Sequence, residues 1–390
     1  METNTEIGRI EVADILNNHS GGFIEKNNLS NQQIKAIKAI ESCRTSGLGY
    51  HKLVCNECKY EQISYNSCRN RHCPKCQLTK QMRWIDKLKA QVLPVRYFHI
   101  VFTLPHQLNT LAYINQSTVY DILFRAAAQT LKQVALNPKF LGGEPAFLAV
   151  LHTWGQNLSY HPHLHMIVSA GGLDPDGLEW KHSGKKFFVP VRAVSKVFRA
   201  KFIDMLEKEY SQSALKIPDT DKGIDYSDFG KVKSLLYSKT WNVYAKKTFK
   251  GAGKVIEYLG RYTHRVAISN SRILSLDNGK VKLRYKDYRD KSKWKTLELS
   301  ALEFIRRFVQ HILPNNFYKI RYFGLLACKN RESKLMICFD RLKASMTVSK
   351  FEGLIWHEII EMATGKDVFK CPVCNKGRLT DPALLIQNTG

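Results

Sequence analysis

Long apolar segments are absent from this sequence of 390 residues: it has no run of 18 apolar residues, which excludes an ordinary membrane-spanning helix. Its first residues lack the charged and apolar regions of a secretory signal peptide, so we expect a cytoplasmic protein. There is no internal repeat and no low-complexity segment. The hydrophobic content is 44%, with 19 Phe and 17 Tyr, which is enough to build a packed core.

Acidic residues are scarce relative to basic ones. The 34 Asp and Glu residues face 60 Lys and Arg residues, which leaves a net charge of +26. A surplus of this size over a whole chain indicates a polyanionic partner, with nucleic acid as the first candidate. We therefore expect nucleic acid rather than a membrane as the partner. The alternative is a basic protein with no special partner.

The ten cysteines include three pairs with the spacing Cys-x-x-Cys. In a cytoplasmic protein this spacing is typical of metal sites rather than disulfides, because each pair offers two thiolates to one tetrahedral ion. The first two pairs are separated by 14 residues, a normal span for a zinc ribbon. We therefore predict one zinc site with four ligands: Cys55, Cys58, Cys73 and Cys76. Since this segment is poor in apolar residues, it needs the metal to fold.

Further cysteines and histidines extend this pattern. A second, interleaved zinc site is predicted from four residues, the alternative being free thiols and surface imidazoles: Cys43, His51, Cys68 and His72. The third pair, Cys371 and Cys374, has no other pair near it in the sequence. We interpret it as reduced thiols of the C-terminal tail, with a ligand role beside His357 as the alternative. Three basic residues of the cysteine segment are predicted to contact phosphates: Arg69, Arg71 and Lys75.

Strands and helices are predicted in alternation along the chain, which indicates an α+β fold. The predicted strands are 97–104, 145–152 and 163–169, followed by a hairpin at 273–285 around Asn278-Gly279. The predicted helices are a segment capped by Ser30, then 81–92, 107–136, 191–210 and 301–313. Changes of pattern divide the chain into three domains: 1–92, 93–270 and 271–390.

Two histidines, His163 and His165, lie two residues apart in an apolar strand, so both imidazoles point to one face of a sheet. Such a pair can hold a divalent cation, and His152 at the end of the preceding strand is the candidate third ligand. Pro162 is expected to interrupt the strand, which leaves His161 outside it. An open site that binds phosphate oxygens usually contains Mg²⁺ or Mn²⁺. The alternative is a set of ordinary core imidazoles.

Tyr258 and Tyr262 lie one turn apart in a predicted helix, so their phenols share a face. Either phenol can attack phosphorus and form a phosphotyrosine link. Three basic residues beside them would stabilise phosphate charge: Arg261, His264 and Arg265. Tyrosines at this spacing more commonly form an aromatic core stripe. Next to the histidine strand, we favour the nucleophilic role.

Together these motifs resemble those of the two-tyrosine HUH transposases of bacterial rolling-circle insertion sequences. The resemblance rests on Leu151 to Gly155, the HUH triplet His163-Leu164-His165, the segment Tyr258 to Arg265, and the cysteine module from Ser67 to Cys76. It implies a palm-like antiparallel sheet with flanking helices in 93–270, beside a small N-terminal zinc-binding domain. By this resemblance, Tyr258 and Tyr262 match the nucleophiles.

The resemblance also implies a chemistry and its partners. His163 and His165 match the ligands of Mg²⁺ or Mn²⁺, and His152 occupies the place of a third histidine in related relaxases. The expected activity is nicking and joining of single-stranded DNA at insertion-sequence ends through a 5′-phosphotyrosine, without an Asp-Asp-Glu triad. The expected partners are single-stranded and hairpin DNA at the element's ends and the target DNA. The expected location is the bacterial cytoplasm, associated with the nucleoid.

Two other functions fit part of the sequence. The run His161 to Ile167 superficially matches the histidine-triad pattern of nucleotide hydrolases. That interpretation leaves the cysteine module, the net charge and the tyrosine pair unexplained. A non-catalytic zinc-ribbon regulator of DNA would explain the cysteines and the charge, but the intact histidines and both tyrosines argue against it.

Overall fold

The computed structural model describes residues 10–184, 189–219, 221, 223–246, 260, 267–288, 290–329 and 331–381. The chain divides into two compact units, and each is assembled from segments that are distant in sequence. The first unit comprises 1–86, 264–312 and 350–390, and the second comprises 87–263 and 313–349. This division differs from the three consecutive domains predicted above, because parts of the predicted C-terminal domain belong to both units.

The second unit is built on a six-stranded sheet in which every strand pair is antiparallel. The order is β11-β4-β5-β3-β7, and β6 pairs with the end of β5 beyond its pairing with β3. The strands are β3 (Tyr97–Thr103), β4 (Glu144–Trp154), β5 (Tyr160–Leu173), β6 (Trp180–His182), β7 (Val243–Lys246) and β11 (Ile320–Gly324). The three strands predicted for this region are thus present, and β5 is its central strand.

Pro162 does not interrupt β5, contrary to the expectation from sequence. The strand begins at Tyr160, and the proline lies where the pairing with β4 is irregular, between the pairs His152–His163 and Trp154–Tyr160. Its carbonyl oxygen still accepts a hydrogen bond from the backbone N–H of Leu104 at 3.3 Å. A proline is tolerated at such a bulge, because no ladder hydrogen bond from its nitrogen is required there.

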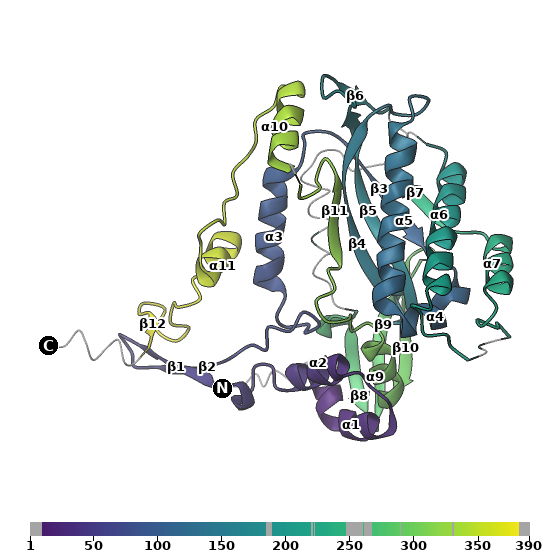
Figure 1. Ribbon diagram of the computed structural model, residues 1–390. Helices are drawn as coiled ribbons and strands as arrows, with labels where there is room; N and C mark the ends of the chain where they lie inside the picture. The colour runs from purple at the N-terminus through teal and green to yellow at the C-terminus, as the bar shows by residue number, and fades with distance from the viewer. Residues whose placement is uncertain are drawn as a thin grey trace. The chain divides into compact units, whose positions relative to one another are not determined.

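Helices cover one face of this sheet. Figure 1 shows α5 and α6 side by side along it, and both helices contact sheet strands. The helices of this layer are α4 (Asn109–Ile114), α5 (Gln116–Leu136), α6 (Val191–Ser211) and α7 (Phe229–Ser238), with a 3₁₀ turn at His106–Leu108. Leu164 and Met166 of β5 are fully buried in the core beneath these helices. Since side chains alternate along a strand, His163 and His165 point to the opposite face.

A second apolar cluster involves α10 (Arg331–Arg341). Leu335, Cys338 and Phe339 of this helix pack with Leu93 and Trp180, among other residues. The helix α3 (Leu78–Gln91) precedes β3, and the boundary between the two units falls within it. The predicted connecting helix is therefore present, although it starts three residues earlier than expected.

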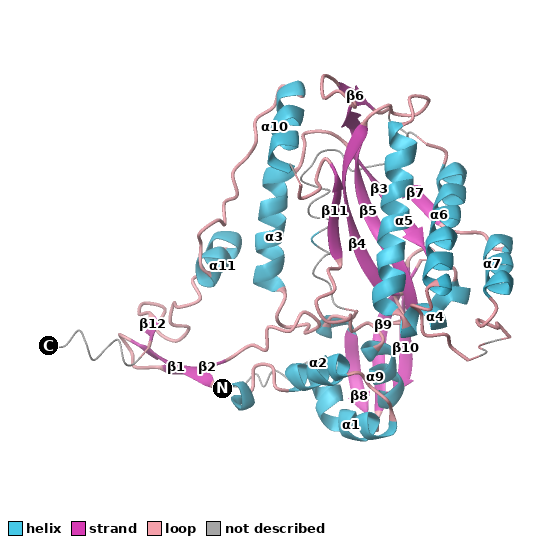
Figure 2. Ribbon diagram, viewed as in Figure 1, coloured by secondary structure: helices cyan, strands magenta, loops and turns pink. Residues whose placement is uncertain are grey.

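The first unit contains a three-stranded antiparallel sheet of order β10-β9-β8 with helices packed beside it (Figure 2). Its elements are α1 (Val12–Lys26), α2 (Asn31–Glu41), β8 (Ile273–Asp277), β9 (Lys280–Asp287), β10 (Lys293–Ser300) and α9 (Ala301–Val309), with 3₁₀ turns at Ser46–Leu48 and Asn270–Arg272. The predicted hairpin turn is present, with positive φ at both Asn278 (47°) and Gly279 (71°). Ser30 caps α2 through the predicted reciprocal bonds with Gln33.

The cysteine module of the first unit contains residues from both ends of the chain. A small sheet of order β12-β1-β2 pairs β12 (Leu379–Thr380) with β1 (Tyr50–Cys55), and β1 with β2 (Glu61–Tyr65). Within it, Cys55 lies opposite Leu379. The remaining helix of this segment is α11 (Trp356–Thr364).

The fold confirms the predicted α+β class with antiparallel sheets and flanking helices. Within the described ranges, no helix is both long and apolar enough to cross a membrane.

The end of β11 depends on a residue without a side chain. Gly324 has φ +59°, and a Cβ there would collide with the carbonyl oxygen of Pro145 and the ring of Phe147. We expect Gly324→Ala to lower the free energy of unfolding by about 2–4 kcal/mol, because both conformational strain and the collision oppose it. The matched control is Gly177→Ala: its φ is +74° but no atom lies within 4 Å of the added Cβ, so about 1 kcal/mol is expected. Equal losses in urea denaturation would contradict the collision.

Candidate metal centres

Three histidines converge on the sheet face opposite the helices. His152 of β4 lies directly across from His163 of β5, and His165 follows two residues later on the same face. The ring nitrogens of the three side chains lie within 4.8 Å of one another. The structure therefore brings together the three residues predicted as one site, although whether they bind a metal stays a prediction.

Hydrogen bonds orient two of these rings. Nδ1 of His163 lies 2.7 Å from the carbonyl oxygen of His161, which can only accept, so this nitrogen carries the proton. Nδ1 of His165 lies 2.8 Å from Nε2 of His99. When Nδ1 of each ligand ring donates, both Nε2 atoms present lone pairs, and these atoms are 3.1 Å apart. Two lone pairs at this distance repel each other unless a proton or a cation lies between them.

Burial keeps these imidazoles neutral. It is the main cause that lowers the pKa of His163 to about 4, with a smaller contribution from repulsion by His161. Burial also lowers the pKa of His165 well below its usual value, and charge repulsion by His152 acts in the same direction. Near pH 7 both rings are therefore uncharged. A metal ligand has to be in this state, since a protonated imidazole has no free lone pair.

The three imidazoles fit a divalent cation. Two nitrogens bound to one ion at about 2.1 Å lie roughly 3 Å apart when the bonds form a right angle. The 3.1 Å between Nε2 of His163 and Nε2 of His165 matches this distance. Imidazole ligands suit Zn²⁺, Mn²⁺ and related ions, and three ligands leave coordination positions open for substrate or water.

His99 of β3 is part of this site and was not predicted. The strand 97–104 was predicted, but its pairing partner was not. In the structure Val101 lies opposite His165 and His99 lies opposite Ile167, which places the His99 ring beside the His165 ring. The two rings are parallel within 7°, with centroids 5.1 Å apart. From the sequence one can see only that His99, Val101 and Thr103 point to the same face of their strand. This identifies His99 as a site residue only once the register of the strand is known.

Trp154 lies next to the site as well. Its ring stacks on His152 with centroids 4.5 Å apart. His152 is also only 3% exposed. The stacking and the burial restrict the orientations that this imidazole can adopt.

The predicted nucleophile segment falls outside the described residues. This applies to both tyrosines and to the basic residues predicted beside them: Tyr258, Tyr262, Arg261, His264 and Arg265. Their roles stay predictions from sequence.

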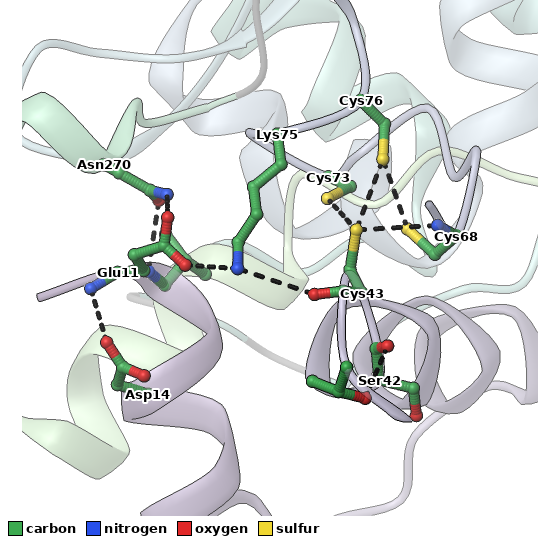
Figure 3. A network of polar contacts seen from close by, with 11 residues as sticks. Glu11, Asp14, Ser42, Cys43, Cys68, Cys73, Lys75, Cys76 and Asn270 are labelled. Carbon is green, nitrogen blue, oxygen red and sulfur yellow. Dashed lines mark hydrogen bonds and ion pairs between the residues drawn. The ribbon is translucent and has the colours of Figure 1, made fainter. Parts of the chain in front are cut away.

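The cysteines form two tetrathiolate clusters, but with different members from those predicted. The first contains Cys43, Cys68, Cys73 and Cys76, whose sulfurs lie within 4.8 Å of one another (Figure 3). The Sγ atoms of Cys43 and Cys76 are 3.3 Å apart, and those of Cys68 and Cys76 are 3.7 Å apart. Sulfurs bound to one tetrahedral zinc ion at about 2.3 Å lie about 3.8 Å apart, so these distances fit zinc.

The second cluster joins residues from opposite ends of the chain: Cys55, Cys58, Cys371 and Cys374. Its sulfurs are 3.7 Å apart for Cys55 and Cys374, and 3.6 Å apart for Cys58 and Cys371. The predicted pairing of Cys55-x-x-Cys58 with Cys73-x-x-Cys76 is therefore wrong, and so is the interpretation of the C-terminal pair as reduced tail thiols. The physical reason is the pairing of β12 with β1, which delivers the C-terminal cysteines next to Cys55.

The predicted histidine ligands are not in either cluster. Among the described residues, the clusters that could hold a metal ion do not contain His51, His72 or His357. His51 is exposed on β1, and His72 is buried with its backbone N–H bonded to Asn70 Oδ1 at 2.9 Å. Four cysteines complete each tetrahedron, so no histidine is needed.

Each cluster contains at least one cysteine whose pKa is lowered, which favours the metal-binding thiolate form of that residue, whereas the pKa values of Cys43, Cys58 and Cys73 are raised. A hydrogen bond with the Cys73 thiol is the main cause that lowers the pKa of Cys68 to about 5. Backbone N–H groups of Gly377 and Lys376 lower the pKa of Cys374 to about 6. Gly377 is required at its position, because an added Cβ would lie 2.7 Å from Asn56 Oδ1 and against the Cys55 sulfur.

The three predicted phosphate-binding residues differ in their surroundings. Lys75 forms an ion pair with Glu11 and lies 3.5 Å from the Cys43 carbonyl oxygen, which ties the first cluster to the start of α1 (Figure 3). Arg71 is partly buried, and burial lowers its pKa. Arg69 and Lys75 line a groove in the module, whereas Arg71 does not. Contact with phosphates stays a prediction for all three.

Both tetrathiolate clusters are expected to bind zinc, which gives two zinc ions per chain. We expect Cys76→Ser and Cys374→Ser each to lose one zinc ion, because a serine hydroxyl replaces one of four thiolates in separate clusters. Metal content of the purified protein, measured by inductively coupled plasma mass spectrometry, checks this. Cys328→Ser is the matched control, since Cys328 is exposed and belongs to neither cluster. One zinc ion in the unaltered protein would contradict the assignment.

Family models match two parts of the chain. The model described as "Transposase zinc-binding domain" matches residues 15–104, which include the first cluster but not Cys371 and Cys374. The model described as "Putative transposase" matches residues 146–334, which include the three histidines and the predicted nucleophile segment.

Solved structures give a weaker likeness. A structure titled as the conjugative relaxase TrwC in complex with OriT DNA, metal-bound, is 15% identical with a TM-score of 0.23, covering 43% of this chain and 71% of that one. A second, titled as TrwC with mutant OriT DNA, has a TM-score of 0.24 and covers 46% and 67%. Scores this low do not establish a shared fold.

Relatives that match along most of this chain identify its family more clearly than the solved structures do. "Putative transposase y4qJ" of Sinorhizobium fredii is 42% identical over 373 residues, which is 95% of this chain and 94% of that protein. The "Transposase for insertion sequence element IS801" of Pseudomonas savastanoi pv. phaseolicola is 29% identical, covering 90% of this chain and 84% of that protein. With a transposase 42% identical along nearly its whole length and with both family models matched, the chain belongs to the two-tyrosine rolling-circle transposases of bacterial insertion sequences.

Proposed function

We propose that this transposase nicks and rejoins single-stranded DNA at the ends of its insertion sequence through a 5′-phosphotyrosine. The observation that carries the proposal is the convergence of three imidazoles, from His152, His163 and His165, on one face of the sheet. A non-catalytic DNA-binding protein has no use for such a cluster. The net charge of +26 supports a DNA partner.

In this proposal the three histidines hold Mg²⁺ or Mn²⁺. The bound ion would polarise the scissile phosphate and fix its position. Neutral imidazoles are suited to this role, because they add no positive charge that competes with the ion. The hydrogen bonds of His163 to the His161 carbonyl and of His165 to His99 hold the ligand rings in one orientation.

The proposed nucleophiles are Tyr258 and Tyr262, by their match to the family motif. The phenol oxygen of one tyrosine attacks phosphorus and loses its proton, the bond between phosphorus and the 3′ oxygen breaks, and this oxygen leaves as a hydroxyl. The strand's 5′ phosphate is then joined to the tyrosine. Attack by another 3′ hydroxyl reverses the step and joins strands, and two tyrosines allow two links to exist in sequence.

The proposed partners are the element ends and the target DNA. By the family resemblance, the element ends are expected to be single-stranded or folded into hairpins when cut. The target DNA would supply the hydroxyl that receives the element.

Cleavage of a labelled single strand that carries the element end, with Mg²⁺ or Mn²⁺, tests this function. The unaltered protein should give a covalent protein–DNA band on a denaturing gel. His163→Ala should reduce this band at least about a hundredfold, and Tyr258→Phe or Tyr262→Phe should abolish one of the two links. His106→Ala is the matched control, since His106 is an exposed histidine of the same unit.

Two outcomes would contradict the proposal. DNA binding with no covalent band from the unaltered protein would favour a regulator instead. Cleavage that persists in the double variant of Tyr258 and Tyr262 would mean that another group attacks the phosphate, as in a histidine-triad hydrolase.

His99 is expected to act as a positioning residue through His165. We expect His99→Leu to raise the Mn²⁺ concentration needed for half-maximal cleavage about 10- to 100-fold, because His165 loses the partner of its Nδ1 atom. His99→Gln should restore much of this loss, since its amide oxygen can accept the same hydrogen bond. A titration with Mn²⁺ measures both. The same Mn²⁺ requirement in all three proteins would show that the His99–His165 bond has no such role.

A further inference from the structure

A groove of about 1,330 Å³ lies on the cysteine module and shares no residue with the histidine site. Its lining combines basic side chains with exposed aromatic and aliphatic ones. The basic members are Arg44, Arg69, Lys75, Lys80 and Arg83, and the exposed apolar members include Ile63, Tyr65, Leu78 and Trp356. Apolar side chains 43% to 53% exposed on a soluble surface call for an explanation.

Charge complementarity points to a polyanion as the occupant. The lining residues that the structure describes include no aspartate or glutamate. Lys75 is already paired with Glu11, and Lys80 and Arg83 point their cationic groups at backbone carbonyl oxygens, of Arg69 and Leu354. A carbonyl leaves the charge of a Lys or Arg uncompensated. With Lys75 neutralised by Glu11, the other basic side chains of the lining, Arg44, Arg69, Lys80 and Arg83, leave the groove with a surplus of positive charge.

One wall of the groove comes from the far end of the sequence. Trp356 and Ile360 lie four residues apart in α11, so they share one face of the helix, and both line the groove. The segment before α11 is tied to α3: Arg83 donates to the Leu354 carbonyl oxygen at 2.7 Å, and the Phe351 N–H donates to Asp86 Oδ2 at 2.8 Å.

The segment after α11 folds back on the start of this helix and leads into the second tetrathiolate cluster. Trp356 and His357 both contact the Phe369 ring, two residues before Cys371. From there Leu379 pairs with Cys55, and the Arg378 N–H donates to Asn56 Oδ1 at 2.8 Å. The segments before and after α11 are therefore both held in place, and the Trp356 side chain stays 52% exposed. It lines the same groove as Arg83, which lies about 270 residues earlier in the chain.

We propose that this groove binds unpaired DNA, with bases stacked on Trp356 and Tyr65 and with phosphates at Lys80 and Arg83. Basic residues interleaved with exposed aromatic rings are the means by which proteins hold single strands, because every base presents a π face to an aromatic side chain. A duplex hides those faces. The inference rests on the proposed function only in that DNA is the substrate, and it adds a DNA-binding site that contains none of the histidines.

Fluorescence anisotropy with a labelled 20-nucleotide single strand and with the matched blunt duplex tests the proposal. All measurements use the full chain with His163→Ala, so that no cleavage occurs. Adding Trp356→Ala should raise the Kd for the single strand at least about fivefold and change the Kd for the duplex less than about twofold. Adding Lys80→Ala should weaken binding and reduce the slope of log Kd against log salt by about 0.7.

Two controls keep the result interpretable. Met362→Ala removes another exposed apolar side chain, 57% exposed on the same helix, that does not line the groove, and it should leave both Kd values within about twofold. Lys52→Ala is the corresponding control for charge, since Lys52 lies outside the lining and pairs with Glu61 at 2.7 Å. The zinc content of each variant confirms that the module is folded.

The outcomes separate this proposal from the function proposed above. Equal single-strand affinity of Trp356→Ala and Met362→Ala, with zinc retained, would overturn the groove and leave the nuclease chemistry untouched. A selective loss in Trp356→Ala, together with a protein that never forms a covalent DNA link, would support the groove and remove the nuclease proposal. Photo-crosslinking of a strand containing 5-bromouracil should place the crosslink on the peptides of Trp356 or Tyr65, and a crosslink elsewhere only would also overturn the groove.

Discussion

The antiparallel register of β3, β4 and β5 is the constraint on which the histidine site depends. It sets His152 opposite His163, and it sets His99 beside His165. Ladder hydrogen bonds hold the three strands in this register, so the imidazoles are positioned by rigid elements before any ion binds. The same alternation sends Leu164 and Met166 into the core. A slip of one residue in β5 would exchange the two sets and destroy core and site together.

Burial gives this site its chemical character. Burial lowers the pKa values of His163 and His165, so their neutral forms dominate near pH 7 and each ring keeps one nitrogen lone pair that a cation can bind. The Nε2 atoms of His163 and His165 are 3.1 Å apart, a distance that one shared proton or one bound cation can bridge. The hydrogen bonds to the His161 carbonyl and to His99 act on the other nitrogen of each ring and so support the same state.

In the first unit, cysteine clusters rather than strand register bring distant residues together. The second cluster joins Cys58 and Cys371, which are 313 positions apart in the sequence. Closing so long a loop costs entropy, but the cost rises only slowly with length, and zinc–thiolate bonds are strong enough to offset it. The cluster thereby makes the C-terminal segment, including α11, part of the N-terminal module. A family model that matches residues 15–104 contains only half of the ligands of this cluster.

The sequence by itself determined the local features. The α+β class, the strands around His99, His152 and His163, the capping of α2 by Ser30, and the turn at Asn278-Gly279 all follow from periodicity and from residues with strong local preferences. The predicted set of His152, His163 and His165 came from the two-residue period of a strand and from a family motif, which are both readable along the chain.

Only the tertiary structure decided which distant residues meet. Cys-x-x-Cys pairs look alike wherever they occur, so their spacing cannot tell whether Cys55 and Cys58 share an ion with Cys73 or with Cys371; the pairing of β12 with β1 settles this. His99 is one of 13 histidines in the sequence, and nothing in its neighbours marks it until the register of β3 against β5 is known. Local preferences act over a few residues, whereas strand pairing and metal coordination select partners by distance in space.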